Sequence, residues 1–190
     1  MSSGKRPYRL KERARRQDET RRRIAAATAA LHEEVGPART TVAEVARRAG
    51  VQRPTVYANF PDERELFAAC QAHFLGEHPP PDPSSALALA DPVQRVGGVL
   101  HSQYAWYRET EAMTGNVQRD RRLLPALDTV VAETSDRQLD ALADALAAGK
   151  APLSRPLIRL ALDFATWKRL TAEGLADDEA AELMARAATA

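Results

Sequence analysis

Residues 40–67, TTVAEVARRAGVQRPTVYANFPDERELF, decide the fold of this chain. Thr41 is followed three residues later by Glu44, a capping box that predicts the start of a helix. Apolar residues then recur at i, i+3, i+4 and i+7, which is one face of a helix; they are Val42, Val45, Ala46 and Ala49. Gly50 follows, and glycine readily accepts the left-handed conformation that ends a helix. The pattern predicts a short helix ending before Gly50.

A second short helix follows the glycine. Pro54 fits the first turn of a helix, where the missing N–H costs nothing. Val56 and Phe60 fall on one face, which we expect to be buried, and the remaining positions are expected to face outward: Arg53, Thr55, Tyr57 and Asn59. Two short helices joined by a glycine turn are typical of a DNA-reading helix-turn-helix. The alternative is a helical hairpin inside a bundle.

The order of a capping threonine, AEVARRAGV, a turn, TVYANFP and a charged helix ending in LF resembles the TetR family of bacterial transcriptional regulators. The resemblance covers roughly residues 20–76. It implies an all-α protein, with a three-helix helix-turn-helix DNA-binding domain followed by a helical ligand-binding and dimerisation bundle. Two positions depart from the family pattern. Gln52 stands in place of the usual serine cap, and Glu63 in place of a phosphate-contacting lysine, for which Arg64 can substitute.

The composition is that of an ordinary soluble globular protein. Of the 190 residues, 44% are hydrophobic and 28% are charged. A single cysteine excludes an intramolecular disulfide and fits a reducing compartment. The sequence contains no apolar run of about 18 residues, so we expect a cytoplasmic protein without a membrane partner.

The charge is divided unevenly along the chain. Residues 1–60 hold 14 Lys/Arg and 6 Asp/Glu, a net of +8, whereas residues 61–190 hold 13 Lys/Arg and 20 Asp/Glu, a net of −7. A basic first third predicts a polyanionic partner for that part alone. We expect residues 1–17 to be a basic flexible arm that neutralises phosphates and becomes ordered on binding.

The helical periodicity extends through the rest of the chain, and no segment has the period of a strand. A helix is expected from Asp18 to Val35, so the DNA-binding domain is placed at 18–61 and the effector-binding and dimerisation domain at 62–190. In the latter, helices are expected over 92–113, 125–148, 153–175 and 177–188. Gly97-Gly98, inside the first of these, predicts close helix packing or a bend.

The expected DNA contacts lie on the helix-turn-helix. Arg53 and Asn59 are candidates for reading bases, because their side chains match guanine and adenine edges. Candidates for holding phosphates are Thr41, Thr55, Tyr57 and Arg64, and Pro54 completes the set at the helix start. Tyr57 could instead be a half-buried core aromatic.

The effector site is the least defined part of the sequence. Candidate pocket residues are Tyr104, Trp106, Tyr107, Met113, Phe164 and Trp167, with Arg108 and Asp163 as polar anchors; plain core packing is the alternative for the aromatic residues. Cys70, His73 and Glu77 share a helix face, but no second cluster completes a metal site, so neither a metal nor a cofactor is expected. Motifs of phosphate-binding loops, serine hydrolases and zinc proteases are missing, and we expect no enzyme.

These features together predict a homodimeric repressor that a small-molecule effector releases from a palindromic double-stranded DNA operator. The 153–175 and 177–188 segments are expected to form the dimer interface, because their apolar residues face more than one side. The alternative is a ligand-independent DNA-binding dimer with an architectural or activating role.

Overall fold

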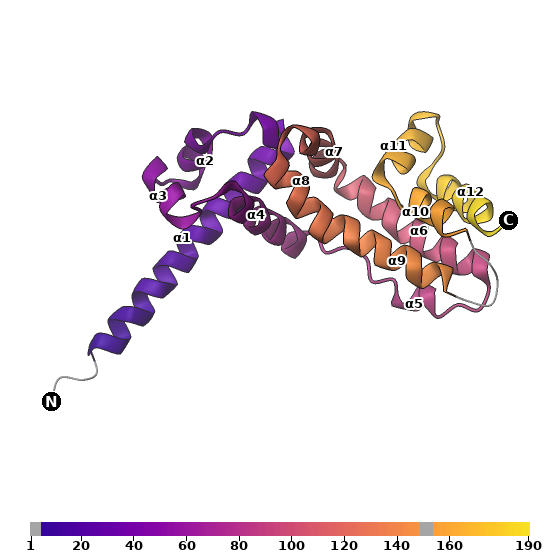
Figure 1. The fold of residues 1–190 in the computed structure, drawn as a ribbon, viewed down its shortest axis with the longest axis horizontal. Coiled ribbons are helices and arrows are strands. Elements are labelled where there is room, and N and C mark those ends of the chain that lie inside the picture. The colour runs from indigo at the N-terminus through magenta and orange to yellow at the C-terminus, as the bar shows by residue number, and fades with distance from the viewer. Residues whose placement is uncertain (1–4, 149–153) are drawn as a thin grey trace. The chain divides into compact units, whose positions relative to one another are not determined.

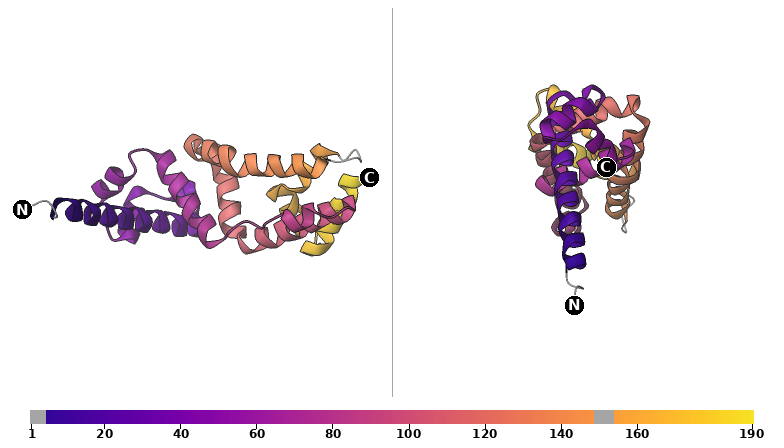
Figure 2. Two further views of the ribbon diagram at one scale, coloured as in Figure 1. Left: turned by 90° about the horizontal axis from the view of Figure 1, so that it is seen from below. Right: turned by 90° about the vertical axis from the view of Figure 1, so that its left-hand side faces the viewer.

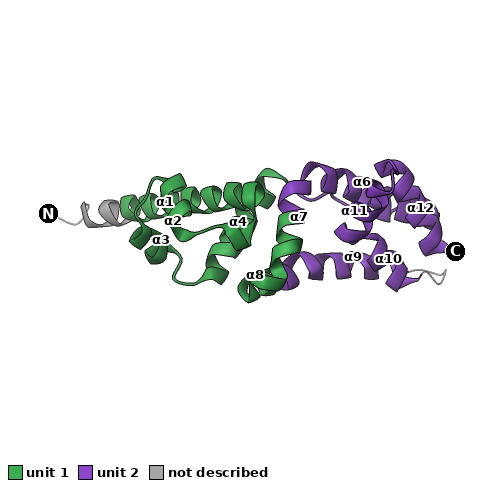
Figure 3. Ribbon diagram, turned by 90° about the horizontal axis from the view of Figure 1, so that it is seen from above, with its two compact units in different colours: residues 1–78, 116–130 green, residues 79–115, 131–190 purple. Residues whose placement is uncertain are grey.

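The computed structural model describes residues 5–148 and 154–190, and these contain helices, turns and loops but no strand. The predicted all-α fold is thereby confirmed. Two compact units are distinguished in Figure 3: unit 1 comprises residues 1–78 and 116–130, and unit 2 comprises residues 79–115 and 131–190. The division into units differs from the boundary predicted after residue 61, since α4 (Glu63–Glu77) packs on α1 (Lys5–Val35) and belongs to unit 1.

Unit 1 contains the predicted helix-turn-helix. Its elements are α1, the 3-10 turn η1 (Pro37–Arg39), α2 (Val42–Ala49), α3 (Arg53–Asn59) and α4, joined by the end of α7 (Glu111–Asp120), the turn η2 (Arg121–Leu123) and most of α8 (Pro125–Val131). Its core is formed by apolar side chains of α1, α2 and α3, and by the residue after α3: Ile24, Ala27, Leu31, Val45, Ala46, Ala49, Val56 and Phe60. The apolar faces predicted for the two short helices supply part of this core, with Val42 partly buried against it.

Helix α1 begins at Lys5, so the predicted helix start near Asp18 is wrong, and α1 includes residues 5–17 of the predicted arm. Residues 1–4 of that arm lie outside the described residues. Glu12 forms ion pairs at 3.1 Å with both Arg15 and Arg16, at helical spacings that stabilise a helix. The N-terminal half of α1 projects past α2, α3 and α4 (Figures 1 and 2). Most of its described side chains over residues 11–20 are exposed.

Unit 2 is a helical bundle. It contains α5 (Ser84–Leu87), α6 (Pro92–Glu109), the start of α7, the π-turn η3 (Ala132–Asp136), α9 (Arg137–Ala147), α10 (Arg155–Ala161), α11 (Phe164–Ala172) and α12 (Asp177–Thr189). Helix α6 packs closely on two neighbours at the glycine pair, on α12 at Gly97 and on α5 at Gly98. A Cβ on Gly97 would lie 3.6 Å from Ala185 Cβ, and one on Gly98 would lie 3.1 Å from Ala86 Cβ. The predicted close packing at these glycines is confirmed.

Three predicted helices of this region are interrupted. The 153–175 segment is two helices rather than one, because Asp163 accepts a hydrogen bond from the Ala165 N–H at 2.8 Å and starts α11 anew; Leu153 itself is not described. The helix predicted over 92–113 ends at Glu109, and a separate helix, α7, runs from Glu111 to Asp120. The 125–148 helix is interrupted by η3. Only the last predicted helix, 177–188, matches α12 closely.

None of the helices that the structure describes is long and apolar enough to cross a membrane.

Candidate nucleic-acid interface

The turn between α2 and α3 is fixed by contacts local to the chain. Thr41 accepts a hydrogen bond from the Glu44 N–H at 3.2 Å and caps α2. Gly50 ends the helix at φ 65° and ψ 38°, and the Val51 N–H donates to the Ala46 carbonyl at 2.9 Å. This geometry is a Schellman motif, in which a left-handed residue ends a helix. The predicted threonine cap and glycine stop are both confirmed.

Helix α2 is also tied to α1. The Arg48 guanidinium donates two hydrogen bonds to the Glu34 carboxylate, at 2.6 and 2.7 Å. A two-point contact of this kind fixes the orientation of the pair as well as its distance. Because Arg48 lies near the end of α2 and Glu34 near the end of α1, the pair helps to set how α2 lies on α1.

Helix α3 begins without a side-chain cap, because Gln52 makes no capping hydrogen bond. Arg53 and Pro54 at its start are exposed, and Tyr57 is 58% exposed, which excludes the alternative of a half-buried core aromatic. Thr55 is half-buried. The helix therefore presents a cation, a proline ring and a phenol to solvent. Thr41 on α2 and Arg64 on α4 are exposed as well.

The prediction that Asn59 faces outward is wrong. Its side chain is buried, with the Nδ2 group donating to the Thr55 carbonyl at 2.8 Å and the Oδ1 atom without a hydrogen-bond partner. Asn59 lies three residues after Val56 and therefore shares its buried helix face. Of the two candidate base readers, only Arg53 has an exposed side chain.

Arg21 of α1 holds the end of α3, a role that no pattern in the sequence indicated. Its guanidinium stacks on the Phe60 ring, with 4.2 Å between Cζ and the ring centroid. It also donates a hydrogen bond to the Asn59 carbonyl. A cation at the C-terminal end of a helix meets the negative end of the helix dipole. Through Arg21, α1 thus fixes the C-terminal end of α3.

The aromatic effector candidates of unit 2 form a packed cluster. The Tyr107 ring lies 5.3 Å from Phe164 and 5.8 Å from Trp167, measured between centroids. The Tyr104 hydroxyl donates to the Ala161 carbonyl and the Tyr107 hydroxyl to the Leu162 carbonyl, each at 2.7 Å. Burial raises the pKa of both tyrosines. The two hydroxyls therefore bind the end of α10, as core tyrosines do.

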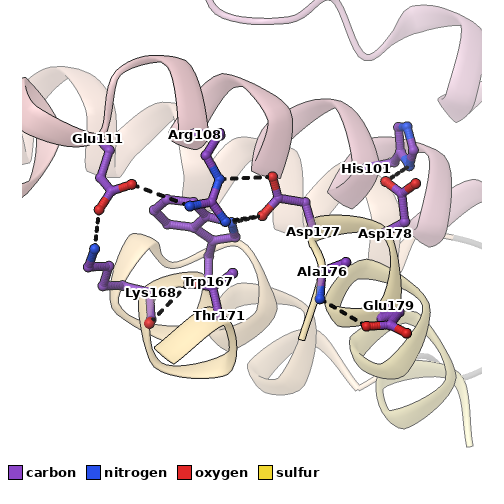
Figure 4. A network of polar contacts seen from close by, with 10 residues as sticks. All are labelled: His101, Arg108, Glu111, Trp167, Lys168, Thr171, Ala176, Asp177, Asp178 and Glu179. Atoms are coloured by element: carbon purple, nitrogen blue, oxygen red, sulfur yellow. Dashed lines mark hydrogen bonds and ion pairs between the residues drawn. The ribbon is translucent and has the colours of Figure 1, made fainter. Parts of the chain in front are cut away.

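Both polar effector candidates contact other protein groups, and Figure 4 shows the contacts of Arg108. Arg108 pairs with Asp177 at 2.8 Å and lies over the Trp167 ring at 4.9 Å, while the Trp167 indole N–H donates to Asp177 at 2.9 Å. The hydrogen bond from Arg108 lowers the pKa of Asp177, and burial offsets it only in part. Asp163 caps α11, as described above. Both predicted anchors thus already have protein partners: Arg108 joins α6 to α12, and Asp163 caps α11.

The remaining candidates are hydrophobic. Met113 is buried and Trp106 is half-buried beside Tyr107. Among the described residues, no group of three or more His, Cys, Asp or Glu side chains is placed to hold a metal ion. Cys70 lies instead against buried His32, with 3.4 Å between Sγ and Nδ1.

Sequence comparisons match a segment near the N-terminus, whereas structural comparisons match most of the chain. Residues 24–70 match the family model described as bacterial regulatory proteins, tetR family. Over 47 residues the chain is 51% identical to an uncharacterised HTH-type transcriptional regulator of Mycobacterium tuberculosis, and an equal match is found in Mycobacterium bovis. That match spans 25% of this chain and 25% of the relative's length.

Solved structures match over most of the chain at low sequence identity. A transcriptional regulator from Rhodococcus sp. Rha1 aligns with a TM-score of 0.63 at 19% identity, covering 88% of this chain and 95% of its own. The regulator RolR, solved in complex with resorcinol, aligns with a TM-score of 0.52 at 20% identity over 92% and 90%. These likenesses establish a shared fold. Together with the match at residues 24–70, they show that the chain carries a TetR-type N-terminal domain within a fold that it shares with transcriptional regulators.

Proposed function

We propose that this protein regulates transcription by binding double-stranded DNA through α3 and the start of α2. The exposed face of α3 carries the proposal: Arg53 and Tyr57 extend from a helix whose opposite face is anchored in the unit 1 core. Arg53 is the proposed base reader, and Thr41, Thr55, Tyr57 and Arg64 are the proposed phosphate contacts. A DNA-binding regulator of this kind acts in the cytoplasm.

The test is to select DNA from the genome that encodes the protein. Purified protein is mixed with fragmented genomic DNA, and retained fragments are sequenced for a shared site. Fluorescence anisotropy then compares that site with a scrambled duplex of equal length at several salt concentrations. We expect tighter binding of the selected site, by a factor of about 10³ or more. Equal affinity for both duplexes would contradict sequence-specific regulation.

We further propose a homodimeric repressor that leaves a palindromic operator when a small molecule binds unit 2. Two observations support this proposal. Leu157, Leu160 and Leu183 of α10 and α12 are 38%, 52% and 49% exposed, a surface suited to a second copy of the chain. RolR, whose fold is similar, binds resorcinol. Loss of operator binding on addition of small phenols would support a similar effector class here.

The alternative, a ligand-independent architectural or activating dimer, is favoured by one observation. The tyrosine hydroxyls and the Arg108 guanidinium in the middle of unit 2 already have protein partners. A ligand would have to displace or extend these contacts. Reporter expression from the selected site, with and without the protein, distinguishes repression from activation.

A further inference from the structure

The C-terminal end of α1 is capped by a residue more than 80 positions later in the chain. The last four carbonyls of a helix have no partner within it. Asn116 of α7 donates its Nδ2 protons to the His32 carbonyl at 2.9 Å and the Glu33 carbonyl at 2.8 Å. The Asn116 Oδ1 atom accepts in turn from Arg119 at 2.7 Å, which fixes the amide orientation.

Asp120, one turn further along α7, binds the next segment of the chain. Its carboxylate is 3% exposed, accepts a hydrogen bond from the Ala38 N–H at 2.9 Å, and pairs with Arg119 at 2.6 Å. Burial raises the pKa of Asp120, but the hydrogen bonds from Arg119 and Ala38 outweigh it and leave the pKa below its ordinary value. The group is thus a carboxylate at neutral pH.

Gly36 makes this approach possible. It adopts a φ of 93°, and a Cβ there would lie 2.5 Å from Asp120 Oδ2 and 2.2 Å from Arg119 Nη2. No side chain fits at those distances in that conformation. The glycine that ends α1 therefore also provides the space that the Arg119–Asp120 pair occupies.

The segment held in this way leads directly into the helix-turn-helix. Turn η1 ends at Arg39, and the Thr40 hydroxyl donates to the Gly36 carbonyl at 2.9 Å, immediately before the cap of α2 at Thr41. We propose that Asn116 and Asp120 are positioning residues for DNA binding, which hold the α1–α2 connection in the one conformation that aligns α2 and α3 for the operator. This inference rests on the proposed function.

The experiment uses the full chain and four variants. Asn116→Asp keeps the size of the side chain but replaces the NH2 group, which donates to two carbonyls, by a negatively charged oxygen. Asp120→Ala removes the acceptor for Ala38, whereas Asp120→Asn retains one acceptor oxygen. Asp128→Asn is the matched control, because Asp128 is an exposed carboxylate of unit 1 that pairs with Arg121 at 2.7 Å. All are assayed well below the lowest melting temperature of the set.

Hydrogen exchange is measured first, without DNA. We expect Asn116→Asp and Asp120→Ala to speed exchange of the Ala38 and Thr40 amides and of α2 by about tenfold or more, the loss expected for a hydrogen bond to a charged group. Asp120→Asn should recover part of the effect, and Asp128→Asn should match the wild type. Unchanged exchange in both disruptive variants would overturn the proposal, whether or not a DNA site has been found.

Operator affinity is then compared with affinity for the scrambled duplex. A positioning role predicts that the ratio of the two falls about tenfold in Asn116→Asp and Asp120→Ala, while the salt dependence stays unchanged because the phosphate contacts remain. Faster exchange with an unchanged ratio would make the contacts merely structural and overturn the role in DNA binding. A wild type that binds no site selectively would instead refute the proposed function, and the exchange result would still decide the conformational claim.

Discussion

His32 shows how burial changes the chemistry of a single residue. Its side chain is 3% exposed, and it lies between Cys70 and the Phe67 ring. Burial lowers its pKa to about 4, and the charge of Asp120 offsets this only in part. The folded protein therefore keeps His32 neutral at pH values where the unfolded chain, with a pKa near 6.5, is protonated.

Stability is predicted to decrease with acidification over this interval. Because the unfolded state binds the extra proton, the contribution of His32 is complete above about pH 6.5 and is lost as the pH falls toward 4. The shift corresponds to about 3 kcal/mol. His32→Gln should remove this part of the pH dependence. Urea unfolding of both proteins at pH 7 and pH 4.5 checks it, and parallel losses in the two proteins would contradict it.

Arg53 carries the prediction for base reading. It is the exposed cation at the start of α3, where its side chain can reach a guanine edge in the major groove. Arg53→Ala should cost about 1–3 kcal/mol at one operator position and relax the preference there. Binding to a set of operators with single base changes measures this. Arg137→Ala, an exposed arginine of unit 2, is the control. Equal weakening on every duplex would assign Arg53 to the phosphate backbone.

At the scale of elements, the N-terminal half of α1 carries the excess positive charge. Removing residues 1–16 should weaken operator and scrambled DNA alike, and each lost phosphate contact should lower the salt slope by about 0.9. The first residue of the unit 1 core is Ile24, so unit 1 is expected to stay folded without residues 1–16. Replacing Arg13, Arg15 and Arg16 by Gln removes three positive charges and the pairs with Glu12, while glutamine still favours a helix. If neither change alters the slope of log K against log salt, this part of α1 does not contact DNA.

The sequence predictions were correct where a feature depends on residues close together in the sequence. Thr41 and Gly50 were assigned correctly, because a cap and a left-handed stop depend on neighbours within a few residues. Periodicity also placed Val56 and Phe60 in the core correctly. The same period could have placed Asn59 beside them, but its polarity suggested an exposed position.

Contacts between distant segments could not be read from the sequence. Asn116 and Asp120 bind the end of α1 and η1 across more than 80 positions, and nothing near either residue indicates this. The break at Asp163 is similar in kind. An aspartate can lie within a helix or cap the start of a new one. Here Asp163 caps α11, next to the carbonyls at the end of α10 that accept hydrogen bonds from the Tyr104 and Tyr107 hydroxyls.

At the scale of the whole molecule, assembly decides whether the proposed mechanism holds. Leu160 is 52% exposed on α10 and Leu183 is 49% exposed on α12, although other residues of these helices form the unit 2 core. Pairing with a second copy about a two-fold axis would bury such surfaces on both chains at once. Two half-sites one helical turn apart require reading helices separated by about 34–36 Å or a multiple of it, which only a fixed dimer provides.

A charged residue on this surface should therefore produce monomers. Leu160→Arg or Leu183→Arg places an unpaired cation where apolar contact is expected, and unit 2 should stay folded because both positions are exposed in the single chain. Leu123→Arg is the matched control, since Leu123 is 69% exposed in η2 of unit 1. Light scattering at micromolar concentration should give a dimer for the wild type and the control, and a monomer for the other two. Those monomers should keep weak, salt-sensitive DNA binding and lose the preference for a palindrome over a half-site. A monomeric wild type would refute the interface, and with it the operator symmetry.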